Sequence, residues 1–73
     1  MDHFAVQYTF NDESQAAWEG DADTPEDAKS AANYYFRKRL RNLTETATAP
    51  PGVGEYFCVV VNLSQAARTA AFT

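Results

Sequence analysis

The run "FAVQYTF" at residues 4–10 limits the possible folds more than any other stretch of the chain. Every second side chain in the run is aromatic or β-branched: Phe4, Val6, Tyr8 and Phe10. The side chains between them are smaller or polar: Ala5, Gln7 and Thr9. Strict alternation of this kind predicts a β-strand with one buried face. A second layer of structure must cover that face.

The next stretch, "SQAAWEGD" at residues 14–21, suits the return strand of a hairpin. Asn11-Asp12 supplies turn chemistry before it. Its Ser, Gln and Ala residues also tolerate a helical turn, so both structures remain open. We favour the strand, because Trp18 can then pack beside the aromatic face of the first strand.

The tetrapeptide "TPED" at residues 24–27 is a helix start signal. Thr24 can cap free backbone N–H groups, and Pro25 suits the first helical position, where an N–H is not needed. Two acidic residues follow at the positive end of the helix dipole. We therefore expect a helix from Pro25 to about Asn42. Its inward side should carry Ala28, Ala32, Tyr35, Phe36 and Leu43, and its outward side Ser30, Tyr34, Arg37, Lys38 and Arg41.

The remainder predicts a loop, a strand and a tail. Residues 44–55 contain Pro50-Pro51 and two glycines and read as a loop. Residues 56–63, "YFCVVVNL", are apolar on both faces, which is typical of a central, well-covered strand. Residues 64–73 show no period and are expected to fray as a flexible tail.

The expected fold is therefore α+β with the order β-β-α-β, in which a three-stranded sheet packs against one helix. Residues 1–63 form the single domain. The strand order stays open; if the third strand lies parallel to the first, the crossover should be right-handed.

The chain of 73 residues has room for one small core and little for an enclosed substrate. His3 is the only histidine and begins a strand, where we expect it to be exposed and without a supporting carboxylate. Cys58 is the only cysteine and should be an inert core thiol. We expect no enzyme activity, cofactor or metal, and a cytoplasmic protein, because the sequence shows neither a signal peptide nor a membrane span.

Positive charge gathers at one place in an acidic chain. The formal net charge is −4, yet four of the six Lys and Arg residues fall within "RKRLR" at residues 37–41. A helix C-terminus favours cations, which explains the sign of the cluster but not its density. The other interpretation is a partner-binding surface, because Tyr and Arg are enriched at interfaces. Its candidate residues are Tyr34, Arg37, Lys38 and Arg41.

A stretch of negative charge precedes the cluster. Residues 12–27 hold seven carboxylates. They repel a phosphate backbone, which disfavours direct nucleic-acid binding. They form either a solubilising surface or one that steers a basic partner or imitates nucleic acid. The candidate contact residues on this side are Asp12, Glu13, Glu19 and Asp21.

A short, acidic, alanine-rich chain without catalytic residues resembles the small host-takeover proteins of bacteriophages, in particular the short transcription regulators of lytic Xanthomonas phages. The resemblance rests on length and composition and carries over no functional residue by motif. It implies a protein that binds a subunit of the host bacterial RNA polymerase, inhibits initiation and promotes antitermination.

Three other functions remain open. One is an anti-CRISPR or anti-restriction inhibitor that uses the acidic stretch as a nucleic-acid mimic. Another is direct nucleic-acid binding through the basic helix end. The last is an oligomerising domain that pairs through the strand at residues 57–63 if that strand lies at a sheet edge. For the regulator, we expect a monomer with a protein partner and no membrane contact.

Overall fold

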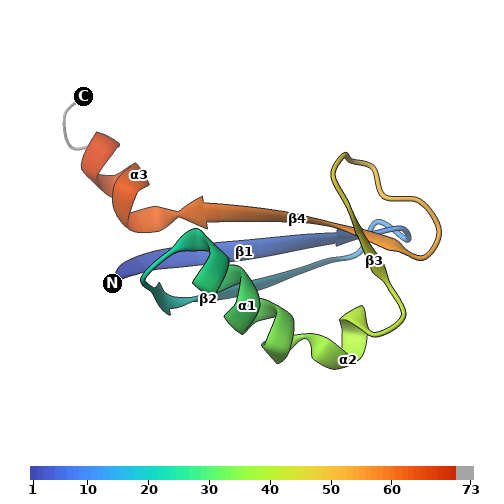
Figure 1. Cartoon of the computed structure of the whole chain (residues 1–73). Coiled ribbons are helices and arrows are strands. Elements are labelled where there is room, and N and C mark those ends of the chain that lie inside the picture. The colour runs from blue at the N-terminus through green and yellow to red at the C-terminus, as the bar shows by residue number, and fades with distance from the viewer. Residues whose placement is uncertain (71–73) are drawn as a thin grey trace.

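The computed structural model describes residues 1–70, in which a four-stranded mixed sheet carries one long helix across one face (Figure 1). The strands are β1 (Asp2–Phe10), β2 (Gln15–Ala22), β3 (Thr44–Thr46) and β4 (Glu55–Asn62). The helices are α1 (Pro25–Tyr35), α2 (Arg37–Leu40) and α3 (Leu63–Ala70). The α+β class is as predicted, with one more strand and two more helices than the sequence indicated.

The hairpin of β1 and β2 confirms the strand interpretation of residues 14–21. The two strands are antiparallel, and Trp18 stands directly opposite Val6. The Trp18 ring lies over Gly20, where an added Cβ atom would come within 2.6 Å of the ring. Glycine at this position therefore makes room for the tryptophan, as a close approach requires.

The sheet order is β2-β1-β4-β3, so β1 rather than β4 is enclosed by full-length neighbours. Because β4 runs antiparallel to β1, no parallel crossover joins the two. Residues Thr44–Thr46, which the sequence placed in a loop, form β3 and pair parallel to Glu55–Phe57. This strand depends on a partner distant in sequence, and three residues carry no periodic signal of their own.

The core lies between α1 and the aromatic face of β1. Thr24 caps the helix by accepting a hydrogen bond from the Asp27 amide at 3.1 Å, as its sequence predicts. Ala28 and Ala32 are fully buried, and their small side chains let the helix approach the sheet. The largest fully buried side chains come from β1: Tyr8, Phe4 and Val6.

The predicted inward position of Tyr35 is wrong, because its side chain is 69% exposed. Phe36, which was also predicted to point inward, does pack against the sheet. Its ring packs edge to face on Tyr8, with 5.3 Å between centroids, and Tyr35 packs on the outer side of Phe36 at 4.9 Å.

The predicted continuous helix over residues 25–42 is also interrupted, at Phe36. This residue has φ −97° and ψ 18° and separates α1 from the single turn of α2. The Arg37 guanidinium donates a hydrogen bond of 3.0 Å to the carbonyl oxygen of Tyr34. A side chain thus satisfies an acceptor at the end of α1, where backbone carbonyls lose their intrahelical partners.

The prediction of a well-covered strand over residues 56–63 is wrong for one face. Tyr56, Cys58 and Val60 lie on the α1 side, across from the aromatic residues of β1. Phe57, Val59 and Val61 alternate with them and point to the opposite face. On that face Val59 is 39% exposed, because α1 covers only one side of the sheet.

Residues Leu63–Ala70 form α3, although the sequence placed Leu63 at the end of the strand and predicted a fraying tail from residue 64. Asn62 begins this helix by accepting a hydrogen bond of 2.8 Å from the Gln65 amide. Arg68 reaches back to Asp2 with 3.6 Å between nitrogen and oxygen. Residues 71–73 of the predicted tail lie outside the described part of the chain.

Candidate functional site

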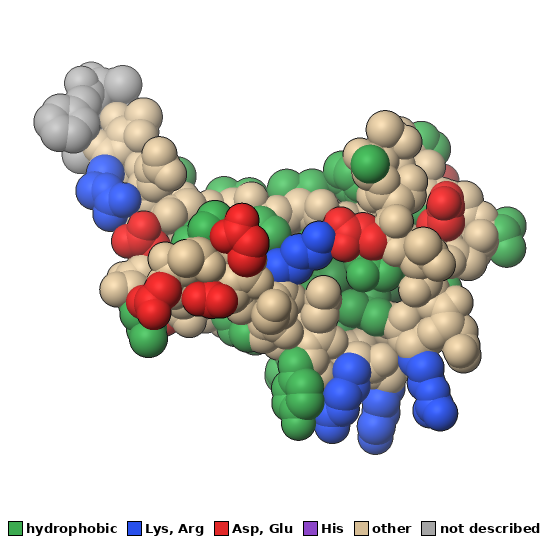
Figure 2. Space-filling view, viewed as in Figure 1, with side chains coloured by type: hydrophobic (Ala, Val, Ile, Leu, Met, Phe, Trp, Pro, Cys, Tyr) green, Lys and Arg blue, Asp and Glu red, His purple; other side chains and the backbone are tan. Residues whose placement is uncertain are grey.

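Four of the residues predicted from the sequence gather at the end of the helical layer: Tyr34, Arg37, Lys38 and Arg41. We call them the basic–aromatic patch. The Arg37 guanidinium lies over the Tyr34 ring, 4.4 Å from its centroid. Tyr34 is 70% exposed, so the stacked pair faces solvent. In Figure 2 the basic side chains project side by side below α2, with a hydrophobic side chain next to them.

The local fold produces this projection. Phe36 and Leu40 pack toward the core, which directs Arg37 and Lys38 outward. Arg39 is the exception: its guanidinium lies 4.0 Å from the centroid of the Phe10 ring and donates to the Ser14 hydroxyl. Arg39 therefore lies along the core, which leaves the other three cations for the patch.

The cations of the patch are not neutralised by any carboxylate in the described part of the chain. Over residues 1–70, neither Arg37, Lys38 nor Arg41 forms an ion pair with a carboxylate. Arg37 binds only the Tyr34 carbonyl and ring, both within the patch. A shallow hollow of about 340 Å³ adjoins the patch, and its lining is Tyr35, Phe36, Arg37, Lys38 and Arg39.

The acidic candidates do not form one surface. Asp12 and Glu13 lie in the turn at one end of the hairpin, whereas Glu19 and Asp21 lie toward the other end of β2. The turn also lies beside Arg39, through Ser14, so negative charge occurs at both ends of the sheet. The Ser14 hydroxyl and amide bind the Asp12 carboxylate and lower its pKa.

Glu19 and Asp21 hold His3 between them, so the prediction of a His3 without a supporting carboxylate is wrong. Asp21 Oδ1 lies 2.8 Å from His3 Nδ1, and Glu19 Oε2 lies 3.3 Å from Nε2. Hydrogen bonding to Asp21, and next to Glu19, raises the pKa of His3 above its usual value. The signal was present in the hairpin register, because His3 stands directly opposite Asp21.

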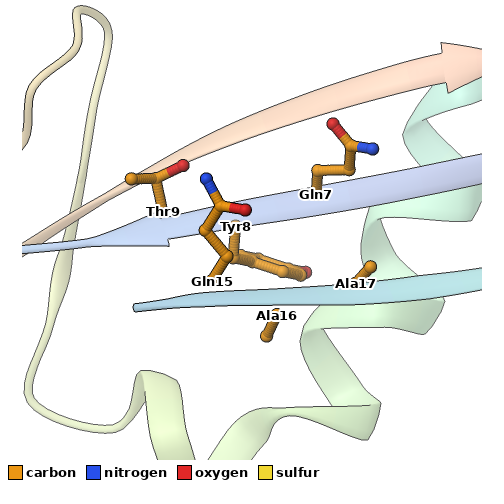
Figure 3. Close-up of a pocket in the computed structure, with 6 residues that line it drawn as sticks. All are labelled: Gln7, Tyr8, Thr9, Gln15, Ala16 and Ala17. Atoms are coloured by element: carbon orange, nitrogen blue, oxygen red, sulfur yellow. The ribbon is translucent and has the colours of Figure 1, made fainter. Parts of the chain in front are cut away.

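The sheet face away from α1 carries a small hollow over β1 and β2, near the hairpin turn that joins them. Its volume is about 230 Å³. Figure 3 shows Gln7, Thr9, Gln15 and Ala17 on one side of the strands, with Tyr8 and Ala16 on the other. Ala17 is opposite Gln7, so a short side chain lies among amide groups that can donate and accept hydrogen bonds. The hollow offers no nucleophile paired with a base.

The titratable side chains between α1 and the sheet form contacts that hold the fold together. The Tyr8 hydroxyl donates to Asn33 Oδ1 at 2.6 Å, and burial raises the pKa of Tyr8. Lys29 pairs with Glu45 at 2.6 Å and links α1 to β3. Burial also raises the pKa of Cys58, which keeps its thiol protonated. Within residues 1–70, no three His, Cys, Asp or Glu side chains are grouped so that they could hold a metal ion.

No helix among the described residues is long and apolar enough to cross a membrane. Comparison of the chain with protein-family models, curated proteins and solved structures gave no match.

Proposed function

We propose that the protein is a non-enzymatic regulator that docks the basic–aromatic patch onto an acidic surface of a partner protein. The observation that carries the proposal is the state of the patch. Its cations form no ion pair in the described chain, and its tyrosine is 70% exposed beneath a stacked arginine. Tyr and Arg at a protruding site are typical of residues that dominate binding energy.

The size of the exposed ring supports a protein partner. A stacked Arg37–Tyr34 pair offers a flat apolar surface together with guanidinium donors, which suits carboxylates set among apolar side chains. Lys38 and Arg41 add charge that steers a negative partner toward the same end of the molecule. Acidic groups at Asp12 and Glu13 lie at this end too, so a continuous phosphate backbone would meet repulsion beside the patch.

The partner we propose is a subunit of the host bacterial RNA polymerase, with inhibition of initiation and antitermination as the outcome. This step rests on the resemblance to phage transcription regulators. The nucleic-acid mimic receives less support, because Asp12 and Glu13 are separated from Glu19 and Asp21 along the length of β2.

The test is the affinity of the purified protein for purified bacterial RNA polymerase, measured by biolayer interferometry. Lys38→Glu should weaken binding by about tenfold or more, because an attractive charge becomes repulsive at the contact. Arg68→Glu is the matched control: it makes the same change in charge on α3, away from the patch, and should leave affinity within about twofold. Tyr34→Ala should also weaken binding, by about tenfold.

Three outcomes would contradict the proposal. If the wild-type protein did not bind RNA polymerase, polymerase would be excluded as the partner. If Lys38→Glu and Arg68→Glu weakened binding equally, the affinity would depend on the net charge of the protein and not on the patch. Binding lost on Glu19→Gln and Asp21→Asn but kept on Lys38→Glu favours the acidic surface instead.

A further inference from the structure

The sheet face opposite α1, which we call the open face, carries two kinds of side chain in a regular grid. Strand register places three residues in each of its main rows. One row is Gln15, Thr9 and Phe57; the next is Ala17, Gln7 and Val59; the next is Glu19, Ala5 and Val61. The column over β4 is therefore apolar, and the column over β2 changes from an amide to a carboxylate.

An apolar β4 column is unusual for a surface that faces water. A sheet with one solvated face normally alternates apolar and polar residues, whereas β4 is apolar on both faces. Phe57 and Val61 are half-buried and Val59 is 39% exposed. From Cys58 to Asn62 the strand contains no charge, so no charged group on the β4 column opposes its burial against another apolar surface.

We infer that the open face binds a second copy of this chain, face to face, about a two-fold axis that lies across the strands. Such an axis places each strand over the same strand of the partner and reverses the order of the residues along it. Val59 then lies over the partner's Val61, and Gln7 over the partner's Ala5. The apolar columns of the two copies meet, as the inner faces of a β-sandwich do.

The same axis brings the carboxylates onto neutral polar groups rather than onto each other. The partner's Glu19 comes over the hollow above Ala17, whose rim includes the Gln7 and Gln15 amides. The partner's Asp21 comes over Gln15. Each amide can donate to a carboxylate, and the β2 column lies at the rim of the contact, where charges stay partly hydrated. The open face is thus complementary to itself in polar groups and apolar surface, with Glu19 and Asp21 keeping their contacts to His3 of their own copy.

This contact is separate from the basic–aromatic patch and leaves it free for another partner. The grid is smaller than a standard interface of roughly 20–30 residues a side, so the dimer should be weak and depend on concentration.

Sedimentation equilibrium over roughly 5–500 µM protein tests the inference in the range expected for a small interface. Wild-type protein should shift from monomer to dimer. Val59→Lys should raise the dissociation constant by about tenfold or more, because a charge would enter the apolar column. Val53→Lys is the matched control: Val53 is 91% exposed and lies in the loop before β4, so the variant should dimerise as wild type does. Circular dichroism confirms that each variant is folded.

Cysteine cross-linking in a Cys58→Ser background tests the geometry. A mixture of Val59→Cys and Val61→Cys proteins should be cross-linked by a short bis-maleimide more than either protein alone. A bifunctional reagent is needed because facing sheets lie about 10 Å apart, too far for a direct disulfide. Val60→Cys should not cross-link to itself, because Val60 points toward α1. A wild-type protein that stays monomeric over the whole range would overturn the inference. So would unchanged dimerisation of Val59→Lys, or efficient self-cross-linking of Val60→Cys, which indicates pairing along the β4 edge.

Discussion

At the scale of single residues, the fold depends on a few close contacts that no pattern in the sequence displays. Trp18 is partly buried and lies flat over Gly20, so the tryptophan and the glycine act as one unit of β2. The alternation of β2 predicts the side of the sheet on which Trp18 lies, but not the neighbour that its ring covers.

Gly20→Ala should destabilise the protein by about 1–3 kcal/mol, the usual cost of overpacking. The added Cβ would lie 2.6 Å and 2.7 Å from two atoms of a ring that packs against the core. Gly52→Ala is the control, since its Cβ would meet only the flexible end of Glu55, at 3.0 Å. Urea unfolding of the two variants measures the difference, and equal free energies of unfolding would show that the tryptophan moves freely.

His3 provides a second test at this scale. Its folded pKa is raised by Asp21 and Glu19, so the stabilising contribution is fully present below the unfolded pKa of about 6.5. That contribution is lost as the pH rises through the folded pKa. We expect the free energy of unfolding to fall across this range above pH 6.5, and His3→Gln to remove the dependence.

An NMR titration of the His3 ring measures the effect directly, because the chain has one histidine. Asp21→Asn should lower the measured pKa more than Asp27→Asn, a matched change at the start of α1. A His3 pKa at or below 6.5 in the wild type would show that the two carboxylates do not hold the ring in solution.

At the scale of elements, local sequence signals predicted where structure begins better than how it pairs. The structure confirms the elements predicted from three signals: the alternation in β1, the Thr24 cap of α1 and the apolar run of β4. The break at Phe36 was not predictable from periodicity, because it depends on Phe36 packing against Tyr8 and on Arg37 reaching the Tyr34 carbonyl. β3 could not be predicted, because its pairing with β4 and its Lys29–Glu45 ion pair both depend on the folded arrangement of other elements.

α3 could have been found, since Asn62 is a good N-cap residue and an alanine-rich segment with strong helix formers follows it. The outward position of the patch residues was predicted from the helical period, and their role as a contact surface was inferred because the cluster is denser than the dipole needs. The His3 site was not recognised, because it required the hairpin register.

Thr24→Ala should cost about 1 kcal/mol of stability, because the Asp27 amide would lose its acceptor at the start of α1. Thr24→Ser keeps the hydroxyl and should retain most of that free energy. Thermal unfolding followed by circular dichroism compares the variants. If Ala and Ser were equally stable, the hydrogen bond seen at this cap would contribute nothing to the helix.

At the scale of the whole molecule, the described chain places one surface on its helical layer and another on its sheet. Helices α1 and α2 end in the basic–aromatic patch, and because α1 lies on only one side of the sheet, the open face is turned away from it (Figure 1). The core between them, formed largely by β1 and the alanines of α1, holds the two surfaces in a fixed relation. A regulator built in this way could bind one partner through the helical end while the sheet contacts another copy.

Hydrogen–deuterium exchange of the protein in complex with purified bacterial RNA polymerase tests the central claim most directly. Patch-mediated docking predicts slower amide exchange across residues 34–41 on binding, with residues 15–21 unchanged from the free protein at the same concentration. Protection of residues 15–21 with no change at residues 34–41 would contradict it.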